Sequence, residues 1–503
     1  MRITNKIIQN NSLTNINTNK VLQDKLSNQI STSKKIARPS DDPIVALRSL
    51  RLRTSVNQTD QYLNKNVADA ESWIRVTEDA IGTLSDIITD IRKQYVKGSS
   101  DSLTVADRRI IAENLQALSE EIYNTGNADF AGRTVFTGFR TDSPLTFPEA
   151  TTQRYEIIQN FDMGDLDEVT FVETEAATAD PNYGPEQRVY ETKVSRIRLP
   201  YNNIDSDITF DVTKPGDSPT DPPTTVNTVS VKVTLADGTV KTINAIAKNK
   251  DEILSTDLVG DTAILAADTG ELFFSDTVAD EIRGGAKNVE VIYAKSNWNK
   301  NDLMPEHYFT CSSNGIEYNY DESVVQEICY NIGVNQTLRI NTTADECFNH
   351  DIRRDINDVL ECISEVETVE KKVSDLRKEF DEIAESDTAA RSSKQQEIDA
   401  AKKEQTFLNG KLQDMFTGLI TKADGYLDQN NIALTNCGTR SKRLELIENR
   451  LDTQITTLQE LKSDNEDVDL AETAIKLSSA KYAYDASLMA TGKIVKESLL
   501  DYI

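Results

Sequence analysis

Apolar residues repeat at heptad spacing between Val56 and Tyr95, and this repeat is the strongest pattern in the chain. Ten of its twelve positions are apolar, the exceptions being Asp60 and Thr77. The repeat predicts one helix about 60 Å long, at about 1.5 Å per residue. A second helix is predicted over 104–124. The buried seam of the long helix is predicted to contain Leu63, Val67, Ile74, Ile81, Leu84, Ile88 and Ile91.

Residues 141–349 have a different pattern, in which apolar and polar residues alternate, as at Val229, Val231 and Val233. Such alternation is typical of strands with one buried face. Asp237-Gly238 lies between two alternating runs and predicts a β-hairpin with a type I′ turn. The proline-rich segment 214–225 predicts an exposed loop. We therefore predict an inserted, mainly-β domain.

Helical periodicity returns at Ile352, continues to Ile383 and weakens in the polar stretch 385–405. From Phe407 a long helical pattern runs to a predicted break at 463–469. A last amphipathic helix follows, with an apolar stripe that we predict to serve assembly. The stripe consists of Leu470, Ala474, Leu477, Tyr484, Leu488 and Val495.

These patterns predict an α+β multidomain fold, in which a long antiparallel helical bundle or coiled coil from the N- and C-terminal regions carries the β insert. The predicted domains are an N-terminal assembly helix that pairs with the C-terminal one (1–40), the two halves of the bundle (41–140 and 350–464), the solvent-facing insert (141–349) and the C-terminal assembly helix (465–503).

The hexapeptide RPSDDP (38–43) interrupts the helical pattern near the N-terminus. Asp42 is predicted to cap a helix that begins at Pro43, where the missing N–H has no cost. Asp41 would add negative charge at the positive end of that helix. Pro39 would end the preceding helix, because proline disfavours the α conformation in the residue before it. A catalytic or metal-binding carboxylate pair would need a converging partner, and none is recognisable nearby. We predict a mechanical joint formed by Pro39, Ser40, Asp41, Asp42 and Pro43.

Charge and composition narrow the classes of function. The chain of 503 residues has a formal net charge of −28, which argues against a nucleic-acid partner. Residues 1–140 carry 19 Lys and Arg against 16 Asp and Glu, so the net charge of −31 lies in the remainder. Apolar runs are too short for a membrane span, and the Asn-rich N-terminus predicts no signal peptide.

The sequence contains only weak candidates for a metal-binding or catalytic site. The sequence SDNEDVD (463–469) lacks the spacing and the glycine of a calcium loop, and a solvated hinge is the better interpretation. His307 with Cys311, and Cys347 with His350, repeat no known zinc-ligand pair and are interpreted as packed residues. We predict a protein that is not an enzyme, with no cofactor, no metal and no small-molecule substrate.

Three segments carry a resemblance. LSNQISTSKKIARPSDDPIVALRSLRL, DRRIIAENLQALSEEIYNTGNADFAGRTVFTG and EDVDLAETAIKLSSAKYAYDASLMATGKIVKESLLDYI resemble the flagellin superfamily at both ends and in the right order. The PSDDP form resembles the hook-associated protein 3 branch of this superfamily, which joins hook to filament. The family usually has Gly where this chain has Ser33, so we expect the turn before the joint to be closed differently here.

The resemblance implies a structural role in the bacterial flagellum, in motility and self-assembly. Its expected partners are further copies in a ring, the first hook-associated protein, flagellin and an export chaperone. It also implies an extracellular location reached through the flagellar secretion channel. Two alternatives stay open: a flagellin-type filament subunit, and a ligand-binding, adhesin or enzymatic function of the β insert.

Overall fold

A computed structural model gives the fold of the chain. It describes residues 5–100, 103–174, 184–205, 210–211, 225–226, 229–253, 257–320, 324 and 326–496. The chain forms two compact units. Unit 1 comprises Met1–Glu71, Tyr330–Leu338 and Lys442–Ile503, and unit 2 comprises Ser72–Cys329 and Arg339–Ser441. The predicted domain boundaries remain predictions.

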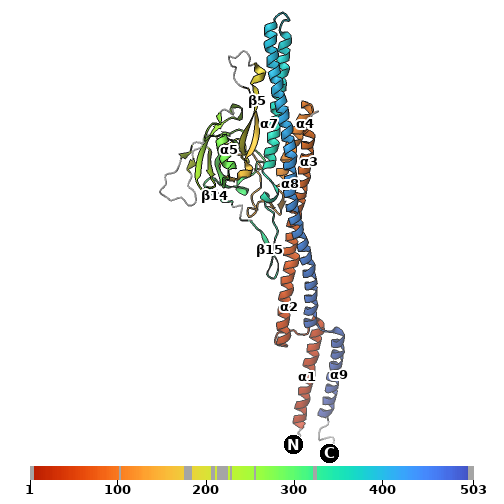
Figure 1. The fold of residues 1–503 in the computed structure, drawn as a ribbon. Helices are drawn as coiled ribbons and strands as arrows, with labels where there is room; N and C mark the ends of the chain where they lie inside the picture. The colour runs from red at the N-terminus through yellow and green to blue at the C-terminus, as the bar shows by residue number, and fades with distance from the viewer. Residues whose placement is uncertain are drawn as a thin grey trace, which may run out of the picture. The chain divides into compact units, whose positions relative to one another are not determined.

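Long helices form both ends of the chain and strands form its middle, which confirms the predicted fold class (Figure 1). The helices are α1 (Asn5–Thr32), α2 (Pro43–Gln61), the π-helix η1 (Tyr62–Val67), α3 (Ala68–Gly98), α4 (Val105–Thr125), α5 (Asp276–Arg283), α6 (Ala344–Cys347), α7 (Asp351–Glu382), α8 (Thr388–Glu466) and α9 (Leu470–Lys496). Among the described residues, none of these helices combines the length and the apolar character that crossing a membrane requires.

The heptad seam is buried along α3, but its N-terminal part follows another register. Val67, Ile74, Ile81, Leu84, Ile88 and Ile91 are buried, whereas Leu63 is half-buried. The predicted position Asp60 is wrong, because Asp60 is exposed and Thr59 is buried in its place. The π-helix η1 lies between the two parts, and its wider turn shifts the face that points inward.

A ten-stranded sheet in unit 2 forms the core of the insert, in the order β14-β13-β3-β12-β8-β9-β10-β11-β5-β4. Neighbouring strands are antiparallel except β9 and β10. Its strands are β3 (Tyr155–Phe161), β4 (Asp167–Thr174), β5 (Val189–Arg198), β8 (Val229–Thr234), β9 (Val240–Lys248), β10 (Ala263–Ala266), β11 (Glu271–Phe274), β12 (Asn288–Lys295), β13 (Thr310–Ser313) and β14 (Ile316–Tyr318).

Six short strands pair outside this sheet. They are β1 (Asp129–Phe130) with β2 (Arg133–Thr134), β6 (Phe210–Asp211) with β7 (Thr225–Val226), and β15 (Cys329–Gly333) with β16 (Gln336–Arg339). Apart from Thr225, the predicted loop 214–225 lies outside the described residues.

The hairpin between β8 and β9 exists, but its predicted type I′ turn is wrong. A type I′ turn needs a positive φ at both central residues, and here only Gly238 has one, at 90°. The Gly238 N–H donates to Leu235 O over 2.9 Å, and the Leu235 N–H donates to Thr239 O over 2.9 Å. The loop therefore has three residues and ends in a glycine bulge, which is the next most common way to close a hairpin.

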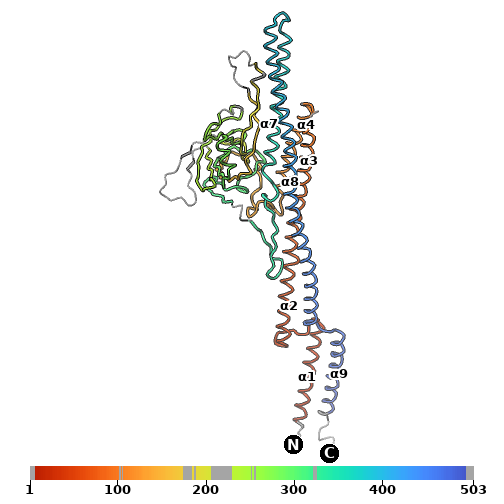
Figure 2. The backbone as a smooth tube through the Cα atoms, in the orientation of Figure 1, coloured from red at the N-terminus to blue at the C-terminus, as the bar shows by residue number. Residues whose placement is uncertain are grey.

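The polar stretch 385–405 is more helical than predicted. Helix α8 begins at Thr388 rather than Phe407, and the Asp387 carboxylate accepts from the Ala390 N–H over 3.0 Å at its start. Ile398, Ala400 and Ala401 are buried in this stretch, so three apolar positions form its inner face. Helix α8 also extends past the predicted break at 463 to Glu466. Figure 2 shows α7 and α8 running side by side.

Candidate assembly site

Helices α1 and α9 of unit 1 lie side by side, so the two ends of the chain pair with each other (Figure 1). Leu26 and Ala480 are buried where the helices meet. The Asn19 amide donates to Ser487 Oγ over 2.8 Å. Few side chains are buried between the helices, which leaves most of their surface exposed.

The predicted C-terminal stripe is only partly covered in the paired helices. Leu477 and Tyr484 are half-buried, on the side that carries the buried residues Thr473 and Ala480. Leu470, Ala474 and Leu488 are exposed, and the side chain of Val495 lies outside the described residues. Exposed apolar side chains on α1 and α9 form a set that we call the terminal apolar surface. It comprises Ile7, Leu13, Val21, Leu22, Leu470, Ile475, Tyr482, Leu488 and Met489.

The segment RPSDDP lies in the turn before α2. The Asp42 carboxylate accepts from the Ile44 and Val45 N–H groups over 3.0 and 3.1 Å, and Pro43 is the first residue of the helix. Asp41 acts upstream: its carboxylate accepts from the Arg38 N–H over 2.8 Å and from Ala37. Asp41 therefore closes the preceding turn. Pro39 and Ser40 lie in that turn.

The prediction that Pro39 ends the preceding helix is wrong. Helix α1 ends at Thr32, and Ser33 has a φ of 56°. A positive φ terminates a helix directly, and for residues other than glycine it is uncommon. Residues 33–35 then run beside residues 466–468: the Val468 N–H donates to Ser33 O over 3.1 Å, and the Lys35 N–H donates to Glu466 O over 2.7 Å. We call these two short segments the crossing.

Glu466 connects the crossing to α2. Its buried carboxylate accepts from Arg53 Nε over 2.6 Å and from Ser49 Oγ, and it lies 3.3 Å from Lys34 Nζ. The Arg53 hydrogen bonds outweigh burial and lower the pKa of Glu466 to about 2. Lys34 also pairs with Asp467. We call Lys34, Ser49, Arg53, Glu466 and Asp467 the joint cluster.

Sequence reasoning missed the joint cluster. Glu466 lies 417 positions from Ser49 and 432 from Lys34, so no local spacing connects them. The acidic stretch 463–469 by itself predicts a solvated hinge and not a calcium loop. Glu466 itself is a weak signal for this cluster in the sequence. A glutamate at the end of a helical pattern can face a basic side chain of a neighbouring element.

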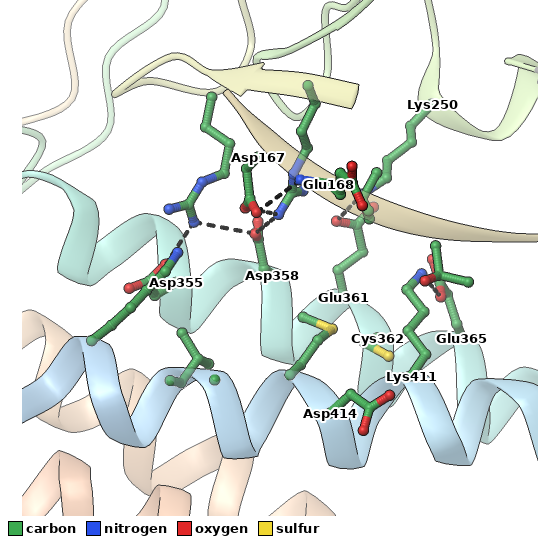
Figure 3. Close-up of a pocket in the computed structure, with 18 residues that line it drawn as sticks. Asp167, Glu168, Lys250, Asp355, Asp358, Glu361, Cys362, Glu365, Lys411 and Asp414 are labelled. Carbon is green, nitrogen blue, oxygen red and sulfur yellow. Dashed lines mark hydrogen bonds and ion pairs between the residues drawn. The ribbon is translucent and has the colours of Figure 1, made fainter. Parts of the chain in front are cut away.

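Unit 2 contains a second charged cluster, between strand β5 and helix α7 (Figure 3). Arg198 contacts Asp355 over 2.6 Å, and Arg196 contacts Asp358 over 2.7 Å. Arg196 also pairs with the buried Glu271. We call this set the clamp; its members are Arg196, Arg198, Lys250, Glu271, Asp355, Asp358 and Glu361.

The clamp lines a cavity of about 250 Å³. Burial alone would raise the pKa of Glu271, but Arg196 and Lys250 outweigh it and lower that pKa to about 2. Burial likewise opposes the ionisation of Asp358, and its arginine partners hold its pKa below the usual range. Each clamp carboxylate pairs with a clamp cation, so the arrangement suits attachment of the strand to the helix rather than proton transfer. In the sequence, the signal for the clamp is the pair Arg196 and Arg198, two arginines in a strand of alternating apolar and polar residues.

The histidines and cysteines considered for zinc lie apart from any metal-type grouping. His307 is buried and its Nε2 lies 3.0 Å from Pro144 O, while burial lowers its pKa to about 4. Cys311 and Cys347 are buried thiols. Within the described part of the chain, no three His, Cys, Asp or Glu side chains gather in a way that could hold a metal ion.

Comparison with known proteins shows what the N-terminal part of the chain is similar to. Residues 3–141 match the family described as "Bacterial flagellin N-terminal helical region". The N-terminal part of the chain is similar to this helical region, and we call it the flagellin-type region. In the flagellin-type region lie α1, the joint, α2, α3 and α4.

Curated relatives belong to the two groups that the sequence resembles, the hook-associated protein 3 branch and the flagellins. Flagellar hook-associated protein 3 of Salmonella typhimurium is 28% identical over 152 residues, which cover 30% of this chain and 47% of the relative. The Escherichia coli protein of that name is 26% identical over 144 residues, 28% of this chain and 45% of the relative. Flagellin of Clostridium tyrobutyricum is 29% identical over 127 residues, 25% of this chain and 33% of the relative.

These matches confirm the resemblance to the flagellin superfamily and to its hook-associated branch. The matched part spans about half the length of the hook-associated relatives.

Proposed function

We propose that this protein is a structural, non-catalytic component of the bacterial flagellum that joins hook to filament. Two relatives named flagellar hook-associated protein 3 support this function. The observation that carries it is the pairing of α1 with α9, which leaves the terminal apolar surface exposed at the two ends of one chain. Monomeric soluble proteins rarely keep such a surface uncovered.

In this proposal the terminal apolar surface is covered by neighbouring copies and by adjoining axial proteins. Burial of apolar surface contributes roughly 25 cal/mol per Å² and offsets the ordering of the helices. The partners are a homo-oligomeric ring, the first hook-associated protein on one side and flagellin on the other. The chain reaches the outside of the cell through the flagellar channel, aided by an export chaperone.

The joint residues Pro39–Pro43 set where α2 begins relative to the crossing. The stripe on α9 from Leu470 to Val495 supplies part of the surface that neighbouring copies cover. In this function the clamp is an attachment for the β insert, without a cofactor or a bound metal.

A flagellin-type filament subunit is the second candidate, because flagellins are also among the relatives. The two functions predict different abundances. A filament subunit would be the main protein of sheared flagella, whereas a junction protein would be a minor one.

Deletion of the gene tests the proposal. A junction protein predicts cells with intact hooks, no filaments and unpolymerised flagellin in the medium, seen by electron microscopy and gel analysis. The intact gene on a plasmid should restore filaments, and a copy lacking residues 482–503 should not. Circular dichroism of the shortened protein should still show a cooperative melt, which separates lost assembly from lost folding. Normal filaments in the deletion strain, or loss of flagellin from the medium, would contradict the proposal.

A further inference from the structure

Helix α2 of unit 1 packs against the end of helix α8 with one side and leaves its other side open (Figure 2). On the packed side Ala46 and Ser49 are buried, and Ser49 Oγ donates to Glu466. The open side carries three large aliphatic side chains that are between 54% and 74% exposed, together with two exposed arginines. We call it the α2 face, and its members are Ile44, Leu47, Arg48, Leu50 and Arg51. Four of them follow the spacing i, i+3, i+4 and i+7, which places them on one side of a helix.

The α2 face is positively charged as well as apolar. Within the described part of the chain, no carboxylate lies within ion-pair distance of Arg48 or Arg51, whereas Arg53 on the packed side contacts Glu466 over 2.6 Å. Arginine is enriched in the interfaces between proteins, and exposed apolar groups that lie together mark such interfaces. Apolar side chains flanked by unpaired arginines therefore suit a partner that is apolar and acidic.

The last turns of α8 carry a surface of this kind. Leu461 is 49% exposed, and the exposed carboxylates of Glu460 and Asp464 lie next to it on the helix. No cation of the described residues lies within ion-pair distance of either carboxylate, although the backbone oxygen of Asp464 accepts from Lys35 Nζ. Spacings of three and four residues place these side chains together. We call Glu460, Leu461 and Asp464 the α8 end.

The two surfaces lie at the same level of the helix pair but cannot meet within one chain. The Asn465 amide donates to Val45 O over 3.1 Å, and Arg53 contacts Glu466, so the start of α2 lies beside the last turns of α8. The α2 face points away from that contact. A second copy at the same level can place its α8 end on the α2 face. Such a contact joins two different surfaces, so it repeats from copy to copy and closes into a ring or continues as a helix.

We propose that the α2 face of one copy binds the α8 end of the next copy, with the two arginines of the first paired to the two carboxylates of the second. This inference rests on the proposed function, because it names a surface through which copies join in the ring. A second copy is favoured over an unrelated acidic protein because the same chain carries both complementary halves. The net charge of −28 disfavours a nucleic acid or an anionic lipid surface as the partner of the arginines. Burial of the aliphatic side chains stabilises the contact, and the charges determine which surfaces meet.

Site-specific photo-crosslinking of the full chain in flagellated cells tests the contact. With Leu47 replaced by p-benzoylphenylalanine, light should join one copy to another, and mass spectrometry of the joined peptides should place the new bond at the α8 end. Arg48→Glu combined with Arg51→Glu should reduce the yield at least about tenfold, because like charges would then face each other. Glu460→Lys combined with Asp464→Lys should reduce it equally.

The charge reversals should also rescue one another. All four changes in one chain, or co-expression of the two reversed chains, should restore the yield because opposite charges face each other again. The matched control is Lys65→Glu combined with Arg443→Glu, which changes the charge by the same amount at exposed positions outside both surfaces and should keep the full yield. The Tm of each purified variant should stay within about 2 °C of the parent, since all the changed positions are exposed.

Several results would overturn the contact. A bond from position 47 to the α2 face of a second copy would mean that two identical surfaces meet, and a bond to another protein would identify a different partner. Absence of a crosslink between copies, or a yield that both charge reversals leave unchanged, would overturn it as well. The outcome is separable from that of the proposed function: a filament subunit would also give the bond between the α2 face and the α8 end, whereas a gene-deletion strain without filaments, together with no crosslink at position 47, would support the junction function and overturn this contact alone.

Discussion

The joint cluster of unit 1 and the clamp of unit 2 use the same chemistry in different surroundings. In the joint cluster the carboxylate of Glu466 is buried, but its partners Arg53 and Lys34 are 52% and 39% exposed. In the clamp both sides are buried: Arg196 is 7% exposed and its partner Asp358 is 10% exposed. Solvated partners can be hydrated again when the pair breaks, whereas buried partners cannot. The clamp should therefore be the more sensitive to loss of one charge.

Removal of one clamp charge is the largest effect we expect. Asp358→Asn should lower the stability of the chain by about 3–5 kcal/mol, because Arg196 and Arg198 would lose a shared buried counter-charge. Chemical denaturation followed by near-ultraviolet circular dichroism measures it. The control is Asp375→Asn on the same helix, whose pair with Lys378 is exposed, so its loss should change the stability far less. Equal effects at the two positions would contradict the contrast between buried and exposed pairs.

Loss of the Glu466 charge should have an intermediate effect. Glu466→Gln should destabilise the crossing by about 1–2 kcal/mol, since Arg53 and Lys34 stay solvated. Hydrogen–deuterium exchange reports it locally, because the Lys35 and Val468 N–H groups bond across the crossing. Faster exchange is expected in peptides that contain these two residues, with no change in peptides from α7.

The stability of the crossing should depend on pH, and the pKa of Glu466 gives the sign of this dependence. The pKa of Glu466 in the folded chain is lowered to about 2, against about 4.3 in an unfolded chain. Its contribution is therefore complete above pH about 4.3 and is lost as the pH falls toward 2. After correction for intrinsic exchange rates, the parent protein should lose protection at the crossing in this range. In Glu466→Gln, protection there should be low already at neutral pH and should decline only slightly with acid, because Asp467 is the carboxylate of the joint cluster that remains. An equally large decline in both proteins would refute Glu466 as the main titrating group.

Local signals in the sequence predicted local structure well. The cap at Asp42, the helix start at Pro43 and the burial of Leu84 and Ile88 each depend on residues within one or two turns. The predicted type I′ turn was wrong for a local reason too. The dipeptide Asp237-Gly238 does not determine how many residues the loop contains.

The rest depends on residues far apart in sequence. Asp60 was assigned to the seam because a regular repeat cannot reveal a π-helix. The start of α8 at Thr388 depends on Ile398 and Ala401 being covered, which a polar composition conceals. Glu466 and the clamp join segments more than a hundred positions apart, so their pairing follows from the topology alone.

The helix cap at the joint should contribute less than either charged cluster. Asp42→Ala should cost about 0.5–2 kcal/mol, because the Ile44 and Val45 N–H groups lose their acceptor. Asp42→Asn and Asp42→Ser should largely restore stability. Asp41→Asn should be mild, since an amide oxygen can still accept from the Arg38 N–H. The measurement is the Tm of each purified variant beside motility in semi-solid agar. Lost motility in both Asp→Asn variants, at unchanged Tm, would indicate a carboxylate function instead of a mechanical joint.

The smallest expected effect is at Ser33, where the backbone rather than a charge is tested. A left-handed conformation costs an L-residue roughly 1–2 kcal/mol, whereas glycine adopts it freely but loses about 0.4–1 kcal/mol through the entropy of its unfolded chain. Ser33→Gly should therefore stabilise the crossing by up to about 1 kcal/mol. Ser31→Gly, two positions earlier inside α1, should destabilise by about 0.5 kcal/mol. The two variants differ only in the φ of the replaced residue, so opposite signs in exchange protection at Lys35 and Val468 identify backbone strain as the cause. Destabilisation by both would mean that the Ser33 side chain matters more than its φ of 56°.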